Sequence, residues 1–141
     1  MNKENKLVPG LPSGFEDRWG KKLLLKKKLL KAIENNFIKF GAESLETPSF
    51  EISRNIGSFL AEDEANPMSD VFSFKDGDES LTARYDLSSP LARFYAQNNQ
   101  ELPSIFKRYQ IQNVFRNEKA GNGRYREFLQ ADFDIVGNVN P

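Results

Sequence analysis

Two long stretches near the end of the chain, residues 105–118 and 124–136, alternate between apolar and polar side chains. A β-strand points successive side chains to opposite faces, so this period of two predicts two strands, each with an apolar and a polar face. The residues between them, 119–123, include two glycines and suit the turn of an antiparallel hairpin. Because the apolar face must be covered, the pattern predicts an α+β fold in which helices flank an antiparallel β-sheet.

The polar face of this hairpin is rich in planar hydrogen-bonding groups. Its members are Arg108, Gln110, Gln112, Arg116 and Glu118 in the first strand and Arg124, Arg126, Gln130, Asp132 and Asp134 in the second. Pairing around the glycine loop would place Arg116 near Arg124 and Gln110 near Gln130. Facing arginines repel each other unless an anion lies between them, and Arg, Gln and Asp suit bidentate recognition. The pattern favours a ligand-binding face over the alternative, a face that simply meets water, which is common in antiparallel sheets.

An amphipathic helix is expected over about 15–40, where apolar residues recur at three- and four-residue spacing. Its apolar stripe comprises Trp19, Leu23, Leu30, Ile33, Phe37 and Phe40, widened by Leu25 and Leu29. Ser13 and Glu16 have the spacing of a capping box, and Gly41 suits the end of the helix. Six lysines lie between residues 21 and 31. A membrane-surface helix would also be basic, but a core or interface helix with its lysines in water is favoured.

Shorter elements lie between the helix and the long strands. They are an extended stretch interrupted by Pro48 (43–52), an acidic loop with a short helical piece (53–69), a small hairpin (71–75 and 80–86) and a second helix that opens at Ser89-Pro90 and runs to about Asn98. In the small hairpin, Thr82, Arg84 and Asp86 alternate with apolar neighbours, so they are expected to extend the polar face. A length of 141 residues suits one domain.

The chain contains no Cys and no His. These absences exclude a disulfide framework and a thiolate zinc site, and they remove the usual nucleophile–base pairs. Catalysis would rely on Arg, Lys and carboxylates, with Mg²⁺ as the expected ion. Lys+Arg and Asp+Glu are equal at 20 each, which argues against a uniformly basic nucleic-acid module and leaves a local anion site open. No apolar run reaches the ~20 residues of a membrane span, so a soluble, cytoplasmic protein without membrane contact is expected.

The second long strand and the end of the first carry a sequence that resembles motif 2 of the class II aminoacyl-tRNA synthetases. Phe115-Arg-Asn-Glu118 matches the F-R-x-E core of that motif. The longer stretch from Gly123 to Asp134, GRYREFLQADFD, resembles the form found in the histidyl-tRNA synthetase family. Residues 105–136 would then be the motif 2 region of a class II catalytic domain.

Two further segments, in the same order as in that family, support the resemblance. Residues 81–88 (LTARYDLS) with 90–93 (PLAR) are similar to the L-R-Y-D-L-T segment that holds the amino acid in the histidyl family. Residues 15–52, the helix and the strand with Pro48, resemble motif 1, which implies a homodimer interface. The similarity covers about Val8 to Gly137.

The resemblance implies roles for individual residues. Activation joins the substrate carboxylate to the α-phosphate of ATP and expels pyrophosphate, so no side-chain nucleophile is needed. ATP would contact Arg116, the catalytic residue, at the α-phosphate, Glu118 at the adenine end and Arg124 at the outer phosphates. L-Histidine would be bound by Asp86, Leu87, Ser88, Arg116, Gln130 and Asp134, with Asp86 at the ammonium and Asp134 at the imidazole N–H. Arg126 would be a phosphate ligand or a partner of Glu118.

Two departures from the family pattern stand out. Ser88 occupies a position that is usually Thr, a change that keeps the hydroxyl. The sequence stops at Pro141, before the family's motif 3 and anticodon-binding domain. The chain is therefore expected to be a truncated fragment of a ligase that charges tRNA(His), inactive by itself, with an unpaired sheet edge near 124–136.

Three alternatives stay open at this point. The first is a non-catalytic, histidyl-synthetase-like regulatory subunit of ATP phosphoribosyltransferase, in which ATP-contacting residues of motif 2 tend to be lost. The second is another class II synthetase. The third is an RNA-binding β domain, which would need exposed aromatic side chains for stacking.

Overall fold

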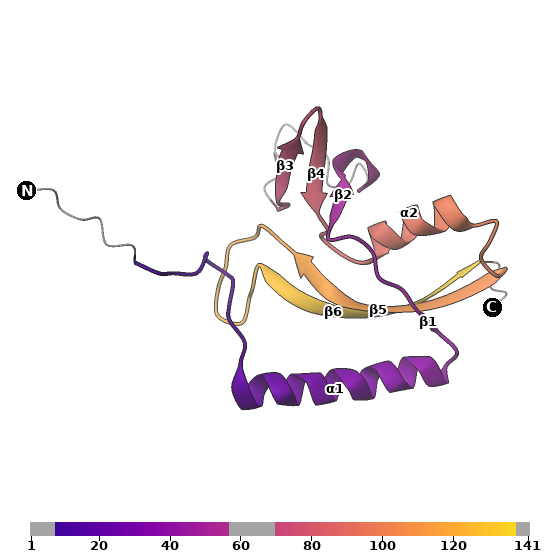
Figure 1. The fold of residues 1–141 in the computed structure, drawn as a ribbon, viewed down its shortest axis with the longest axis horizontal. Coiled ribbons are helices and arrows are strands. Elements are labelled where there is room, and N and C mark those ends of the chain that lie inside the picture. The colour runs from indigo at the N-terminus through magenta and orange to yellow at the C-terminus, as the bar shows by residue number, and fades with distance from the viewer. Residues whose placement is uncertain (1–7, 57–69, 138–141) are drawn as a thin grey trace, which may run out of the picture.

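The computed structural model describes residues 8–56 and 70–137. Within these ranges the chain forms two three-stranded sheets and two α-helices (Figure 1). The large sheet has the order β1-β5-β6, in which β5 (Ile105–Phe115) and β6 (Glu127–Gly137) form the long antiparallel hairpin. β1 (Glu43–Ser44) runs parallel to β5 on its other side. The predicted hairpin and the α+β class are confirmed, and β6 is the edge of the described sheet, as predicted.

The small sheet has the order β2-β4-β3 and lies apart from the large one. Its strands are β2 (Phe50–Ile52), β3 (Ser73–Asp76) and β4 (Glu79–Ala83), and the 3-10 turn η1 (Ser53–Asn55) follows β2. The hairpin of β3 and β4 is confirmed. The expectation that Thr82 extends the polar face of the long strands is wrong, because its hydroxyl bonds to those of Ser53 and Ser73 at 2.8 Å within the small sheet. Most of the predicted acidic loop, residues 57–69, lies outside the described residues.

The first helix, α1 (Gly20–Lys39), begins later than residue 15, where the sequence predicted its start. Residues 15–19 are not helical, and with Gly14 they pass beside the loop end of the long hairpin. Gly14 accepts a hydrogen bond from the Arg126 backbone N–H (2.8 Å), and the Phe15 and Phe72 rings lie 6.1 Å apart. These tertiary contacts override the local helix signal. The capping box is absent, since the cap residue Trp19 makes no side-chain hydrogen bond. At the other end Gly41, with φ of 75°, terminates the helix as predicted.

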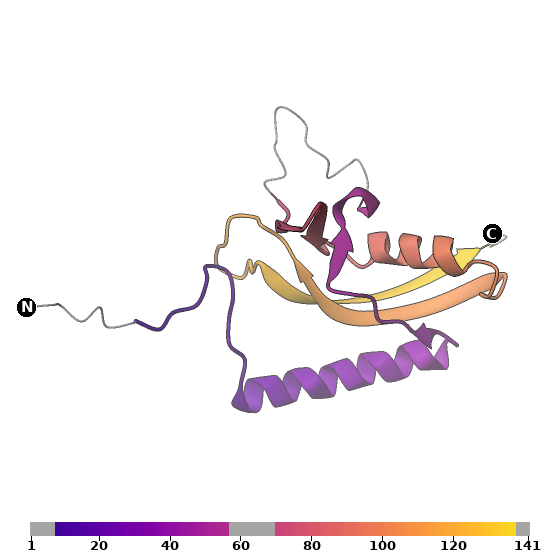
Figure 2. The same cartoon turned by 45° about the horizontal axis from the view of Figure 1, so that its top comes forward.

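The two helices lie on opposite sides of the large sheet (Figures 1 and 2). α2 (Ser88–Asn98) begins one residue before the predicted Ser89. Its Leu91 forms a core cluster with Leu45 and Phe106, and its Phe94 and Tyr95 pack against this cluster. Neither helix is long and apolar enough to cross a membrane, within the ranges the structure describes.

The register of the long hairpin differs from the prediction by two residues. Gln110 lies opposite Asp132, not Gln130, and the Arg116 backbone N–H donates to the carbonyl of Arg126, not Arg124 (2.9 Å). The strands also end earlier, at Phe115, and restart later, at Glu127, so the connection is longer than residues 119–123. Because the shift is an even number of residues, each side chain keeps its predicted face.

The burial of the two faces argues against the alternative of a polar face that simply meets water. Arg108, Gln110 and Val114 on the polar face are all 0% exposed. On the apolar face α1 covers the middle of the sheet, where the Phe37 ring lies 5.7 Å from Tyr109 and 5.6 Å from Phe133. The predicted apolar stripe of α1 is only partly covered. Its members Trp19, Leu25, Leu29 and Phe40 are 78%, 70%, 60% and 70% exposed.

Candidate active site

Arg116 extends from the end of β5 and lies between two aromatic rings. Its guanidinium carbon is 4.4 Å from the centroid of the Tyr85 ring and 5.1 Å from that of Phe128. Its Nε donates to the Tyr85 carbonyl at 3.4 Å. Cation–π contacts of this kind fix the plane of the guanidinium without neutralising its charge. The fork of Arg116 is therefore held in place as a binding group for an anion.

Glu118 lies beside Arg116 and receives two hydrogen bonds. Tyr85 Oη donates at 3.1 Å, and the guanidinium of Arg124 donates to the other carboxylate oxygen. The Arg124 hydrogen bond lowers the pKa of Glu118, and the Tyr85 bond lowers it further. Burial, and then the Glu118 carboxylate, raises the pKa of Tyr85, so the phenol keeps the proton that it donates. The result is an ionised acceptor whose orientation is fixed from two sides.

These groups surround a hollow of about 340 Å³ at the loop end of the long hairpin, where β5 and β6 are connected. Its lining residues are Arg116, Glu118, Gly123, Arg124, Tyr125 and Phe128. The structure thus brings together the three residues predicted to bind ATP. Two cations, one carboxylate and two aromatic rings suit a ligand that combines phosphates with a flat heterocycle.

The turn 86–88 leads from the small sheet into α2. Asp86 Oδ1 accepts the backbone N–H of Ser89 at 3.1 Å, so the first turn of α2 is capped by Asp86 and not by the predicted Ser89. Ser88 is exposed. Leu87 is 0% exposed, so its side chain is not free to contact a ligand. Its carbonyl accepts a hydrogen bond from Arg108 at 3.2 Å.

The predicted residues of β6 lie on the polar face of the large sheet. Gln130 Nε2 donates to both oxygens of Asp132 at 2.9 Å. Asp134 forms an ion pair with Arg108, 2.6 Å away and directly opposite on β5. Arg108 was not among the residues proposed from the sequence. Its place on the polar face was visible, but its partner depended on the register, which the sequence predicted wrongly.

Tyr85 and the turn after it connect the residues predicted to bind ATP with those predicted to bind histidine. Tyr85 contacts both Arg116 and Glu118, and Asp86 follows it directly. Leu87 in turn meets Arg108, which meets Asp134. A chain of contacts therefore joins the residues predicted to bind ATP to those predicted to bind histidine. In Figure 2, α2 and the small sheet lie on the side of the large sheet opposite to α1.

Two other arginines of the motif regions hold the scaffold. Arg84, buried, donates to the carbonyls of Thr47, Pro48 and Asn113 at 2.7, 3.2 and 2.6 Å. Burial lowers its pKa. Arg126 lies over the Phe72 ring at 4.7 Å and donates to the Ser13 carbonyl at 3.4 Å. No hydrogen bond joins it to Glu118 among the described residues, and its contacts fasten the segment before α1. Its assignment as a phosphate ligand or a partner of Glu118 stays a prediction.

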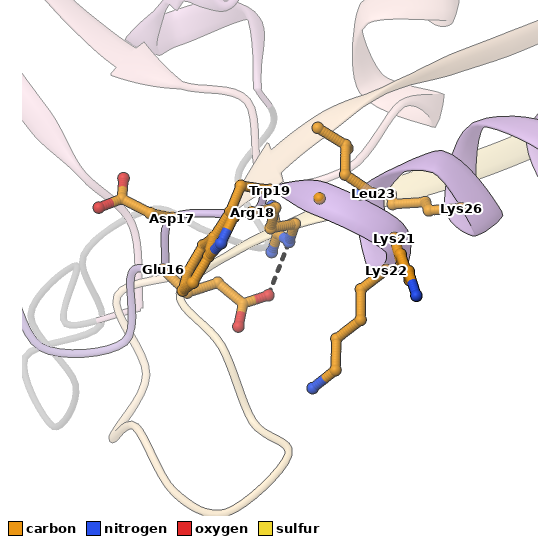
Figure 3. Close-up of a pocket in the computed structure, with 9 residues that line it drawn as sticks. Glu16, Asp17, Arg18, Trp19, Lys21, Lys22, Leu23 and Lys26 are labelled. Atoms are coloured by element: carbon orange, nitrogen blue, oxygen red, sulfur yellow. Dashed lines mark hydrogen bonds and ion pairs between the residues drawn. The ribbon is translucent and has the colours of Figure 1, made fainter.

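A larger hollow of about 600 Å³ lies elsewhere, at the start of α1 (Figure 3). It is formed by the segment 16–19 and the first turns of the helix, including Lys21, Lys22 and Lys26. Arg18 donates to Glu16 within it at 2.6 Å. Burial and the charge of Arg18 lower the pKa of Lys26. None of the predicted site residues lines this hollow, so size alone does not mark the site.

The sequence matches the model of the tRNA synthetases class II core domain (F) over residues 17–140. That match covers both helices, both sheets and the polar site, and the chain belongs to this family. The resemblance seen in the motifs is therefore confirmed.

Particular relatives narrow the comparison within the class. The chain is 78% identical over 141 residues to a histidine--tRNA ligase of Pelagibacter ubique, covering 100% of this chain and 30% of that protein. It is 48% identical over 128 residues to the histidine--tRNA ligase of Methylocella silvestris, covering 90% of this chain and 25% of that protein. The chain thus spans less than a third of the length of these curated relatives.

Solved structures show the same fold. Histidyl-tRNA synthetase from Nostoc sp. PCC 7120 superposes with a TM-score of 0.77 at 27% identity, covering 94% of this chain and 29% of that one. A Bacillus halodurans protein described as an ATP phosphoribosyltransferase regulatory subunit/histidyl-tRNA synthetase gives a TM-score of 0.76 at 21% identity, covering 99% and 35%. The second likeness shows the fold alone.

Proposed function

We propose that this chain forms the motif 1 and motif 2 part of the catalytic core of a histidine–tRNA ligase. Such an enzyme activates L-histidine with ATP and transfers it to tRNA(His). The observation that carries the proposal is the 78% identity, over the whole chain, to a ligase of that name. The retained cluster of Arg116, Glu118 and Arg124 supports it, because an activating enzyme needs cations and an oriented acceptor at the nucleotide.

The site chemistry follows from the positions of these groups. A carboxylate oxygen of histidine attacks the α-phosphorus of ATP, and the bond to the pyrophosphate oxygen breaks, so no proton moves in this step. Arg116, clamped between two rings, would bind the α-phosphate and the incoming carboxylate and stabilise the charge on the phosphoryl oxygens. Glu118 would accept a hydrogen bond from the exocyclic amine of adenine. Arg124, the more exposed partner of the ion pair with Glu118 at 65% exposure, would reach the outer phosphates.

The amino acid would lie further along the polar face. Asp86, beside the first turn of α2, would face the ammonium, with the Ser88 hydroxyl next to it. Asp134 and Gln130 on β6 would face the imidazole, Asp134 as acceptor of a ring N–H. A buried donor left without its acceptor costs about 1–3 kcal/mol, so these contacts would set the choice of histidine.

Further parts of the assembly are proposed with the ligase. A homodimer through α1 would cover Leu25 and Leu29, which are largely exposed. Mg²⁺ is commonly bound through substrate phosphates and keeps several waters, so ATP itself would supply most of its ligands. The described residues include no cluster of three or more Asp and Glu that could hold a metal. A cytoplasmic location accompanies this proposal.

The test uses a chimera in which this chain replaces the 78%-identical segment of the Pelagibacter ubique ligase. ATP–pyrophosphate exchange should depend on L-histidine. Arg116→Ala should reduce exchange by about 10²-fold or more, because the group that stabilises the phosphoryl charge is lost. Arg54→Ala, which removes an exposed arginine of η1, is the matched control and should leave exchange unchanged. Equal exchange with other amino acids would rule out the histidyl assignment.

The regulatory-subunit alternative is not favoured by the curated relatives, which are named as ligases at 78% and 48% identity. The likeness to the Bacillus halodurans protein, at 21% identity, speaks only for the fold. A chimera that binds histidine but shows no exchange would return this alternative to consideration.

A further inference from the structure

We propose that Arg108 is a positioning residue for amino-acid recognition, which holds together the two sides of the histidine pocket. This inference rests on the proposed function. One side of the pocket is the turn 86–88, and the other is β6 with Asp134. Arg108 lies between them on β5 and contacts both.

The contacts of Arg108 reach three elements. It lies 2.6 Å from Asp134 Oδ2 on β6, and it donates to the Leu87 carbonyl at 3.2 Å in the turn before α2. The Nη1 of Arg108 donates to Gln110 Oε1 at 3.1 Å, which connects the Arg108 side chain to its own strand. The side chain is 0% exposed. A planar fork with separate N–H groups can brace these elements at fixed distances, which a lysine ammonium on a flexible stem cannot do equally well.

The electrostatic surroundings agree with a role in the pocket. Burial lowers the pKa of Arg108, while the charges of Asp134, Asp132 and Asp86 act to raise it. Asp86 and Asp134 are the two acids proposed to bind the substrate ammonium and imidazole. A buried ion pair is poor at adding stability, because desolvation offsets the attraction. A role in placing these acids accounts for an arginine at this position better than a gain in stability.

The orientation of Asp134 shows how this placement would act. Its Oδ2 is buried against Arg108, while the side chain as a whole is 36% exposed. The exposed part is therefore the part turned away from Arg108, where it can accept a substrate N–H. Gln130 Oε1 and Arg108 Nε are also buried without a hydrogen-bond partner among the described residues. Removing Arg108 would free Asp134 to rotate and would release the Leu87 carbonyl, while Arg116, Glu118 and Arg124 keep their contacts.

The experiment compares two buried arginines in the same chimera. Arg108→Lys and Arg108→Gln should raise the KM for L-histidine about tenfold or more and change the KM for ATP by less than about twofold. Arg84→Lys is the matched control, since Arg84 is also buried but bonds chiefly the backbone carbonyls of Thr47, Pro48 and Asn113, with one further bond to the Gln112 side chain, and contacts neither Asp134 nor Leu87. It should lower the thermal midpoint and leave the ratio of the two KM values unchanged.

A double-mutant cycle with Asp134→Asn tests whether Arg108 acts through Asp134. If it does, Arg108→Gln should add little to the histidine KM of Asp134→Asn. Fully additive effects, or equal rises in both KM values, would overturn the proposal. So would loss of folding in both Arg108 variants while Arg84→Lys remains folded, because Arg108 would then be a stability residue. An unmodified chimera without histidine-dependent exchange would instead refute the proposed function.

Discussion

The two faces of the large sheet are opposite in composition, but their burial does not follow their polarity. The polar face carries Arg108 and Gln110, both 0% exposed, beneath α2 and the turn before it. On the apolar face, under the single helix α1, Tyr109 is buried but Ile135 is 45% exposed. Polarity alone therefore does not predict burial here, because the covering elements decide which side chains are inside.

The difference has a physical explanation on each face. On the polar face most buried groups find partners, as when Gln110 Nε2 donates to Thr47 Oγ1 at 2.8 Å, so most of the desolvation penalty is offset. The exceptions among the described residues include Arg108 Nε and Gln130 Oε1. On the apolar side an exposed leucine costs little in a monomer and becomes favourable when a partner covers it. A charged interior face next to an incompletely covered apolar layer is compatible with the proposed substrate site and the proposed dimer interface.

The largest expected effect comes from breaking the buried polar face. Arg84→Met should lower the free energy of unfolding by about 3 kcal/mol, because several buried carbonyls lose their charged donor. Ile135→Ala, on the open apolar face, should cost less than about 1 kcal/mol, since its side chain is already half in water. Urea unfolding of both variants measures the two values. An equal cost at the two positions would show that the faces do not differ in this way.

An intermediate effect is expected from the exposed face of α1. Replacing Leu25 and Leu29 by Lys should change the free energy of unfolding of the protomer by less than about 0.5 kcal/mol. It should also weaken the proposed dimer, because two charges would be buried in the interface. Sedimentation velocity of the chain and of the chimera provides the measurement, with Lys28→Glu on the same helix as a control. An unchanged dimer would place the interface on another surface.

The smallest expected effect is a pH dependence of stability that arises from Glu118, at the loop end of the long hairpin. The folded pKa of Glu118 lies below its ordinary value of 4.5, because Arg124 and Tyr85 hydrogen-bond to the ionised form. The stability that ionised Glu118 contributes is therefore fully present above the pKa of Glu118 in the unfolded chain. It is lost as the pH falls through the lower pKa of Glu118 in the folded chain. The stability of the chain should decline more steeply below pH 4.5 than that of Glu118→Gln. Parallel pH profiles of the two proteins would contradict the assigned hydrogen bonds.

Much of the site was visible in the sequence because its signals are local. F-R-x-E at 115–118 and the alternation through Asp134 predicted Arg116, Glu118 and Gln130 on one face. In the structure Gln130 lies on the polar face, while Arg116 and Glu118 follow the end of β5 in the connection. An error of two residues in register left those faces intact, since the period of a strand is two. The partner of each residue was lost with the register, and for this reason the Arg108–Asp134 pair was missed.

The sequence alone determined the α+β class, the long hairpin, both helices and the face on which the polar residues of the two long strands lie, because these depend on periodicity and on local turn residues. Only the tertiary structure decided the separation of the small sheet, the extended path of residues before Gly20 and the burial of the polar face. Each of these depends on contacts between residues distant in the chain, such as Arg126 with Gly14 and Arg84 with Thr47. Local propensity holds no information about such contacts, and where they compete with it they are strong enough to prevail.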